Sequence, residues 1–82
     1  MTMKEHKSVF RTADLALAAA LCVSRFGVDS VEKVDQQRLV FIFERNERLN
    51  DAVDQYWRGE MLVEPQTYFN QLKVLKARIY QR

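Results

Sequence analysis

Three carboxylates at helical spacing are the first group in this sequence that could do chemistry. Glu47, Asp51 and Asp54 stand at i, i+4 and i+7, which places them on one face of a helix. A cluster of carboxylate oxygens can bind Ca²⁺ or Mg²⁺. Arg48 and Arg58, however, stand within about one helical turn of these carboxylates, a spacing that favours ion pairs on an exposed helix. We therefore expect a solvated surface here and no metal site.

The single histidine and the single cysteine do not form a catalytic or metal-binding set. His6 has no cysteine or second histidine at the spacing of a zinc site. Cys22 lies inside the most apolar segment, where a thiol is packed and unreactive. The two glycines fall at expected helix ends and leave no glycine-rich loop for a phosphate. We expect no catalytic residue, no cofactor and no enzymatic activity.

Basic residues give the clearest functional indication. Residues 65–82 contain four basic and no acidic side chains, whereas residues 46–64 contain two basic and five acidic ones. A basic surface attracts phosphates, as nucleic-acid binding requires. The candidate contacts are Lys73, Lys76, Arg78, Arg82, Lys4 and Lys7. A solvated surface is the competing interpretation, because cations also stabilise a helix C-terminus and because the last two arginines project from a different side than the two lysines.

The elements that position these residues belong to one small domain, residues 1–82. Hydrophobic residues make up 48% of the chain and charged residues 29%, an ordinary globular mixture, and the net charge is +2. The longest apolar run, residues 15–23, is much shorter than the roughly 20 residues that span a membrane. One cysteine cannot form an internal disulfide, so we expect a reducing compartment and a cytoplasmic location, with no membrane partner.

The segment TADLALAAALCV, residues 12–23, admits two interpretations: an export signal or a buried helix. Asp14 directly precedes the apolar run, where an export signal avoids acid, and Leu21 precedes Cys22, where lipoprotein processing requires a small residue. Thr12 can cap a helix and Gly27 can end it. We therefore predict a helix over residues 13–26 at the centre of the core, after a short strand at residues 8–11.

The next segment predicts an antiparallel hairpin. Residues 28–34 and 38–44 flank a turn at residues 35–37, and the second strand is rich in β-branched and aromatic residues. Both faces of that strand are apolar, so we expect it to be covered on both sides or to lie at an interface. The predicted self-association surface, joined to a second copy by a two-fold contact, consists of Leu39, Val40, Phe41, Ile42 and Phe43.

Two amphipathic helices complete the predicted order β-α-β-β-α-α of an α+β domain, in which they pack the apolar central helix and the hairpin. The first begins after Asn46, ends at Gly59 and buries Leu49, Ala52, Val53, Tyr56 and Trp57. The second begins at Pro65 and buries Tyr68, Phe69, Leu72, Leu75, Ile79 and, at its end, Tyr80. Between them we expect Leu62 or Val63 in the core, and we expect residues 1–7 to be a flexible arm.

Four stretches resemble a known family. FRTADLALAAAL, FIFER, YWRGE and YFNQLKVLKARIY, spread from Phe10 to Tyr80, resemble a family of small prokaryotic and phage-associated domains catalogued only as a domain of unknown function. The resemblance implies an intracellular protein encoded on a phage or mobile element. It implies no activity, cofactor or catalytic residue.

Two functional hypotheses follow from these observations. The first is a non-enzymatic protein-interaction module that self-associates, with another protein as a further candidate partner. The alternative is a nucleic-acid-binding accessory protein that uses the basic C-terminal helix and the N-terminal arm. The first rests on apolar surface that one chain cannot cover, and the second rests on the basic residues.

Overall fold

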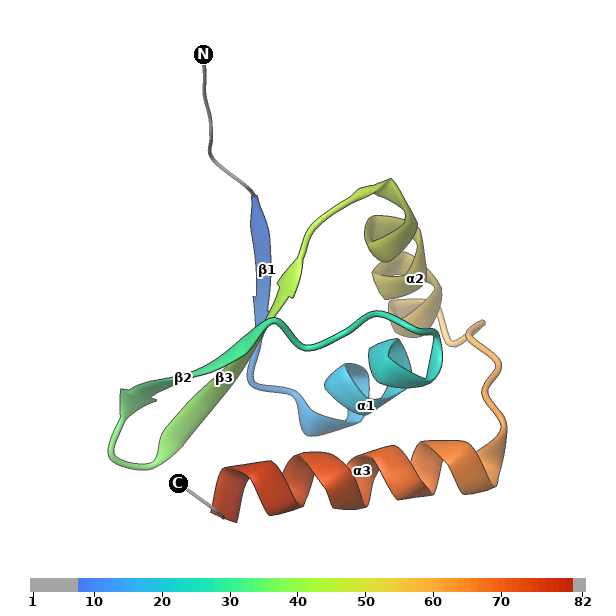
Figure 1. Cartoon of the computed structure of the whole chain (residues 1–82). Helices are drawn as coiled ribbons and strands as arrows, with labels where there is room; N and C mark the ends of the chain where they lie inside the picture. The colour runs from blue at the N-terminus through green and yellow to red at the C-terminus, as the bar shows by residue number, and fades with distance from the viewer. Residues whose placement is uncertain (1–7, 81–82) are drawn as a thin grey trace.

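Residues 8–80 are described by a computed structural model and form three strands and three helices (Figure 1). The β-α-β-β-α-α order and the α+β class are those predicted. The flexible arm predicted for residues 1–7 lies outside the described residues. In chain order the elements are β1 (Val9–Thr12), α1 (Leu15–Val23), β2 (Ser30–Asp35), β3 (Arg38–Glu44), α2 (Glu47–Trp57) and α3 (Pro65–Tyr80).

The sheet is antiparallel and has β3 as its central strand, in the order β1-β3-β2. Phe10 of β1 pairs with Phe43, and Val31 of β2 pairs with Phe41. The predicted hairpin is therefore correct, and β1 adds a strand at its other edge. Because both edges of β3 are already paired, another chain cannot extend the sheet along this strand.

The two apolar faces of β3 are covered in different ways. Phe41 and Phe43 are buried in the core, and Figure 1 shows the helices gathered against one face of the sheet. Ile42 points to the opposite face and is nevertheless only 4% exposed. Arg11 and Glu32 flank β3 on that face and form an ion pair of 2.6 Å across it. Their aliphatic stems and this ion pair shield Ile42, so one chain covers most of the strand.

Helix α1 is the buried centre of the fold, as predicted, with Leu17 through Leu21 inaccessible to solvent. Its N-cap is Asp14, whose carboxylate accepts a hydrogen bond of 3.2 Å from the backbone N–H of Leu17. The predicted cap at Thr12 is wrong, because Thr12 ends β1. The Thr12 hydroxyl instead accepts the backbone N–H of Asp14 at 3.0 Å and so orients the true cap.

The end of α1 also differs from the prediction. Arg25, and not Gly27, adopts the left-handed conformation, with φ of 74°. The backbone N–H of Arg25 donates to the Cys22 carbonyl and that of Phe26 to the Leu21 carbonyl, each at 3.0 Å. These two hydrogen bonds define a Schellman motif, which closes the helix two residues earlier than the glycine would. The predicted Gly59 cap of α2, with φ of 72°, is confirmed.

Helix α2 and the segment after it bury fewer side chains than predicted. Asn46 caps α2 by accepting the Leu49 N–H at 2.9 Å, as expected, but Trp57 is 64% exposed at its end. In the connection, Leu62 is 93% exposed and Val63 is only half-buried, whereas Met61 packs against the core. The strong apolar character of Trp57 and Leu62 thus does not predict their burial. A chain this small exposes some large apolar side chains because its core is small.

Helix α3 passes along α1 and extends to the β2–β3 hairpin (Figure 1). Its inner face packs against the core through Tyr68, Leu72, Leu75 and Ile79. Phe69 and Tyr80, both predicted on this buried stripe, point outward and are exposed. Within residues 8–80, none of the helices is long and apolar enough to cross a membrane.

Candidate functional site

An outer stripe of aromatic and basic side chains runs along α3. It consists of Phe69, Lys73, Lys76 and Tyr80, at i, i+4, i+7 and i+11, which is one helix face. Phe69 is 59% exposed and Tyr80 is 82% exposed, and both lysines are exposed between them. The packing of the inner face, where Leu75 is 2% exposed, fixes how the helix is rotated about its own axis. The stripe is therefore fixed by the core and not by its own contacts.

The two halves of the stripe differ in their local contacts. The Lys73 ammonium lies 5.2 Å from the centroid of the Phe69 ring, a cation–π contact at the solvent surface. Phe69 also lines a shallow hollow of about 360 Å³ at the start of α3, together with Pro65, Gln66, Asn70 and Lys73. Tyr80 lies at the opposite end of the helix, about 16 Å away for a separation of eleven residues.

The N-terminus of α3 is already occupied by a carboxylate of the chain itself. Glu64 accepts hydrogen bonds from the backbone N–H groups of Gln66 and Thr67 and from the Thr67 hydroxyl, at 3.0, 2.7 and 2.6 Å. The Thr67 hydroxyl bond, followed by the two backbone bonds, lowers the pKa of Glu64, so the group stays negative at neutral pH. An incoming anion must therefore be held by the lysines and not by this helix end.

The predicted nucleic-acid contacts separate into three groups. Lys73 and Lys76 share the outer stripe, as the sequence indicates. Arg78 projects from another side of α3, close enough to the Cys22 thiol to offset part of the rise in its pKa that burial causes. Lys4, Lys7 and Arg82 lie outside the described residues. The structure thus joins two of the predicted cations with two aromatic rings that were assigned to the core.

The predicted self-association surface lies mostly inside the chain. The side chains of Phe41, Ile42 and Phe43 are buried, whereas Leu39 and Val40 are half-buried. A second chain can therefore reach only two of these five residues without unfolding the first. Self-association itself stays a prediction, but this strand offers little surface for it.

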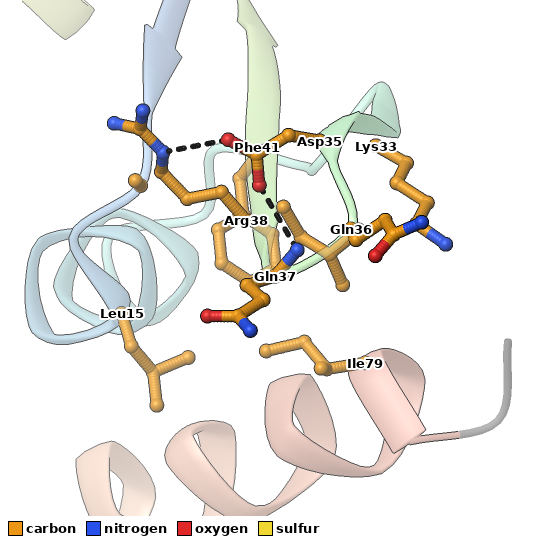
Figure 2. Close-up of a pocket in the computed structure, with 10 residues that line it drawn as sticks. Leu15, Lys33, Asp35, Gln36, Gln37, Arg38, Phe41 and Ile79 are labelled. Atoms are coloured by element: carbon orange, nitrogen blue, oxygen red, sulfur yellow. Dashed lines mark hydrogen bonds and ion pairs between the residues drawn. The ribbon is translucent and has the colours of Figure 1, made fainter.

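A second hollow lies between the tip of the β2–β3 hairpin and the ends of α1 and α3 (Figure 2). It has a volume of about 540 Å³ and apolar walls from Leu15, Leu39, Phe41 and Ile79. Its rim is polar: Asp35 accepts the Gln37 backbone N–H at 2.9 Å and pairs with Arg38 at 3.6 Å, and the Gln37 side chain points toward Leu15 and Ile79 in Figure 2. These polar groups partner one another at the surface, and the wall offers shape but no reactive group.

The three carboxylates predicted on one face of α2 lie at the surface. All of them are exposed, and Arg58 pairs with Glu60 at 3.1 Å. Among residues 8–80 there is no group of three or more His, Cys, Asp or Glu side chains that could hold a metal ion. The three exposed carboxylates of this α2 face are Glu47, Asp51 and Asp54.

Besides Glu64, two groups among residues 8–80 have a shifted pKa, Cys22 and Tyr56, and both stay protonated at neutral pH because their pKa values are raised. Burial raises the pKa of the Cys22 thiol, and the Arg78 guanidinium offsets only part of that effect. Burial also raises the pKa of Tyr56, and the Asp14 carboxylate adds to the rise. Neither shift creates an activated nucleophile, because activation requires a lowered pKa.

Comparison with known proteins assigns the chain to a family. The model of a family described as a domain of unknown function, DUF5659, matches residues 7–81, nearly the whole chain. The chain belongs to the DUF5659 family. No curated protein and no solved structure matches it significantly. The resemblance to an uncharacterised family is thus confirmed, while a phage or mobile-element origin and a cytoplasmic location stay predictions.

In this member of the DUF5659 family, sequence reasoning missed the aromatic half of the outer stripe. Phe69 and Tyr80 were placed with the core because they are apolar and adjacent to inner-face residues. The helical spacing contains the correct answer: eleven residues are close to three full turns, so both rings share a face with Lys73 and Lys76. For an apolar residue that shares a helix face with two lysines, a surface position is more consistent with the pattern than a buried one.

Proposed function

We propose that this chain is a non-enzymatic module that binds single-stranded nucleic acid through the outer stripe of α3. The observation that carries the proposal is the placement of two exposed lysines between two exposed aromatic rings on one face of α3. Stacking of bases on aromatic side chains and attraction of phosphates to lysines are the two interactions that such binding requires. The stripe presents groups for both interactions on the surface of the folded domain.

The aromatic rings favour a single strand over a duplex. In a duplex the faces of the bases are stacked on one another, so a protein reaches only their edges in the grooves. In a single strand the faces are accessible, and rings such as Phe69 and Tyr80 can stack on them. The distance of about 16 Å between these residues is the length of at most about five stacked nucleotides at about 3.4 Å each. A short, weakly sequence-selective site is therefore expected.

Charge sets the strength and the salt dependence of binding. Lys73 and Lys76 provide two phosphate contacts, and each contact on a single strand contributes about 0.7 to the slope of log affinity against log salt. Two contacts give a slope of about 1.4, so affinity falls about sevenfold between 50 and 200 mM salt. Glu64 repels phosphate at the start of α3, which directs the strand backbone toward the two lysines.

Fluorescence anisotropy with a labelled single-stranded 12-mer at these two salt concentrations tests the proposal. We expect saturable binding at 50 mM salt that weakens with salt, and weaker binding to the matching duplex. Lys76→Glu should reduce affinity strongly. Lys33→Glu is the matched control, because it makes the same charge change at an exposed residue of β2, outside α3. Absence of single-strand binding at 50 mM salt, or equal effects of the two variants, would overturn the proposal.

A protein partner is the second candidate, and the exposed Trp57 and Leu62 favour it. Both lie near the end of α2, where a large apolar contact could be made. A symmetric contact through α3 is disfavoured, because it would bring the lysines of two copies together. Light scattering of the protein alone at low micromolar concentration tests whether that partner is a second copy of the chain. A 9.7 kDa monomer would exclude self-association under those conditions.

A further inference from the structure

The hollow at the start of α3 is lined by polar side chains that unselective stacking and phosphate binding do not require. Its lining includes Phe69 and Lys73 from the outer stripe and the amide side chains of Gln66 and Asn70. The two amides are four residues apart, so they stand one turn apart on the same side of α3, and both line the hollow beside Phe69. An aromatic ring, two amides and a cation are thus gathered around one recess of about 360 Å³.

The two amides are available for a ligand. Both side chains are exposed, and neither forms a hydrogen bond with any other residue in the range 8–80. Each amide offers an N–H donor and a carbonyl acceptor at its end. An amide of Asn or Gln matches the N6 donor and N7 acceptor of adenine with two simultaneous hydrogen bonds.

Lys73 can exchange its present contact for a phosphate. Its ammonium lies over Phe69 at 5.2 Å, and an exposed cation–π contact of this kind is weaker than the stacking of a base on an aromatic ring. A base that stacks on Phe69 therefore displaces the ammonium. The displaced lysine remains one turn from the ring, where it can pair with the phosphate of the same nucleotide or the next one.

From this arrangement we infer that the hollow is an adenine-selective subsite of the single-strand surface, an inference that rests on the proposed function. The base stacks on Phe69, the Gln66 or Asn70 amide pairs with its N6 and N7 edge, and Lys73 binds the adjoining phosphate. Lys76 and Tyr80, the rest of the stripe, lie outside the hollow and bind without regard to base.

Three 12-mers that differ only in their two central bases test the subsite. All are thymidine oligomers, and their two central nucleotides are adenine, cytosine or thymine. In anisotropy titrations at 50 mM salt we expect the adenine strand to bind at least about fivefold more tightly than the other two. Adenosine monophosphate should compete only weakly, because it lacks the contacts to Lys76 and Tyr80.

Gln66→Ala combined with Asn70→Ala should remove the adenine preference and leave the affinity for the thymine strand unchanged. Both residues are exposed and alanine favours a helix, so the fold is retained. Gln71→Ala is the matched control, because it removes a neighbouring amide that lies outside the hollow, and it should keep the preference.

The possible failures are distinguishable. Equal binding of all three strands, or an adenine preference that survives the double variant, overturns the subsite and leaves the proposed function intact. Displacement by adenosine monophosphate at the affinity of the whole strand would identify a free-nucleotide site and also overturn the subsite. Absence of binding to every strand overturns the subsite and the proposed function together.

Discussion

The inner and outer faces of α3 both carry aromatic side chains, but only the inner ones are tied to the rest of the molecule. Tyr68 is half-buried, and its hydroxyl donates a hydrogen bond of 3.4 Å to the Ala16 carbonyl on α1. Phe69, the next residue, is 59% exposed and contacts only a lysine of its own helix among the ring contacts described. Position around the helix, not residue type, thus separates structural aromatic residues from those available to a partner.

The inner and outer faces of α3 should respond differently to substitution. Substitutions on the inner face should lower the free energy of unfolding and affect binding only through folding. Substitutions on the outer stripe should lower the binding affinity and leave the free energy of unfolding nearly unchanged. A variant on either face that changes both properties equally would show that the two faces are not independent.

The largest effect is expected on the inner face, for Leu75→Ala. Leu75 is 2% exposed and packs in the core, and a buried leucine truncated to alanine costs about 2–5 kcal/mol. This is a large part of the stability of a small domain. Urea unfolding followed by circular dichroism measures the loss. A change below about 1 kcal/mol would show that α3 is not anchored through this residue.

On the outer stripe, Phe69→Ala should weaken single-strand binding by about 1–3 kcal/mol, roughly 5- to 150-fold, because one stacking contact is lost. Its free energy of unfolding should change by no more than about 0.5 kcal/mol, since the side chain is exposed. Anisotropy and urea unfolding measure the two quantities. Val74→Ala is the control: it shortens an exposed apolar side chain on a different side of α3 and should leave the affinity unchanged.

The charges of the outer stripe should affect salt dependence more than stability. Lys73→Gln combined with Lys76→Gln should lower the slope of log affinity against log salt by about 1.4, because two phosphate contacts are lost at about 0.7 each. Titrations at four salt concentrations between 50 and 200 mM give this slope. An unchanged slope would mean that phosphates are bound elsewhere, for example by Arg78.

The smallest effect is expected for Tyr68→Phe on the inner face. The substitution keeps the packed ring and removes only the hydroxyl that reaches Ala16. A long, half-buried hydrogen bond of this kind contributes about 0.5 kcal/mol. Single-strand affinity should be unchanged, although Phe69 is the adjacent residue. A loss of affinity in Tyr68→Phe without a loss of stability would contradict the separation of the two faces.

The order of elements could be predicted from the sequence because hydrophobic periodicity and turn residues agree along the chain. The helix ends were harder. Thr12 and Asp14 both favour an N-cap, and the choice between them depends on how far β1 extends along β3, which is a long-range contact. Likewise, Arg25 takes a left-handed conformation that a glycine such as Gly27 adopts at lower cost.

The candidate site was only half predictable. Lys73 and Lys76 were identified from charge alone, because lysines are rarely buried and their position on a helix is enough. Phe69 and Tyr80 were not, because an aromatic side chain suits both a core and a surface platform. The rotation of α3 about its own axis decides whether such a ring is buried or exposed. That rotation is set by the packing of Leu75 and its inner-face neighbours.

The central claim is that single-stranded nucleic acid binds at the outer stripe of α3. The most direct test is an NMR titration with an unlabelled 12-mer, in which the backbone amide chemical shifts are measured. The predicted result is a set of saturable shift changes confined to α3, largest at Gln66, Phe69, Asn70, Lys73, Lys76 and Tyr80, that diminish as salt is raised. Shift changes centred on the β2–β3 hairpin or on α2, or no shift changes at 50 mM salt, would contradict it.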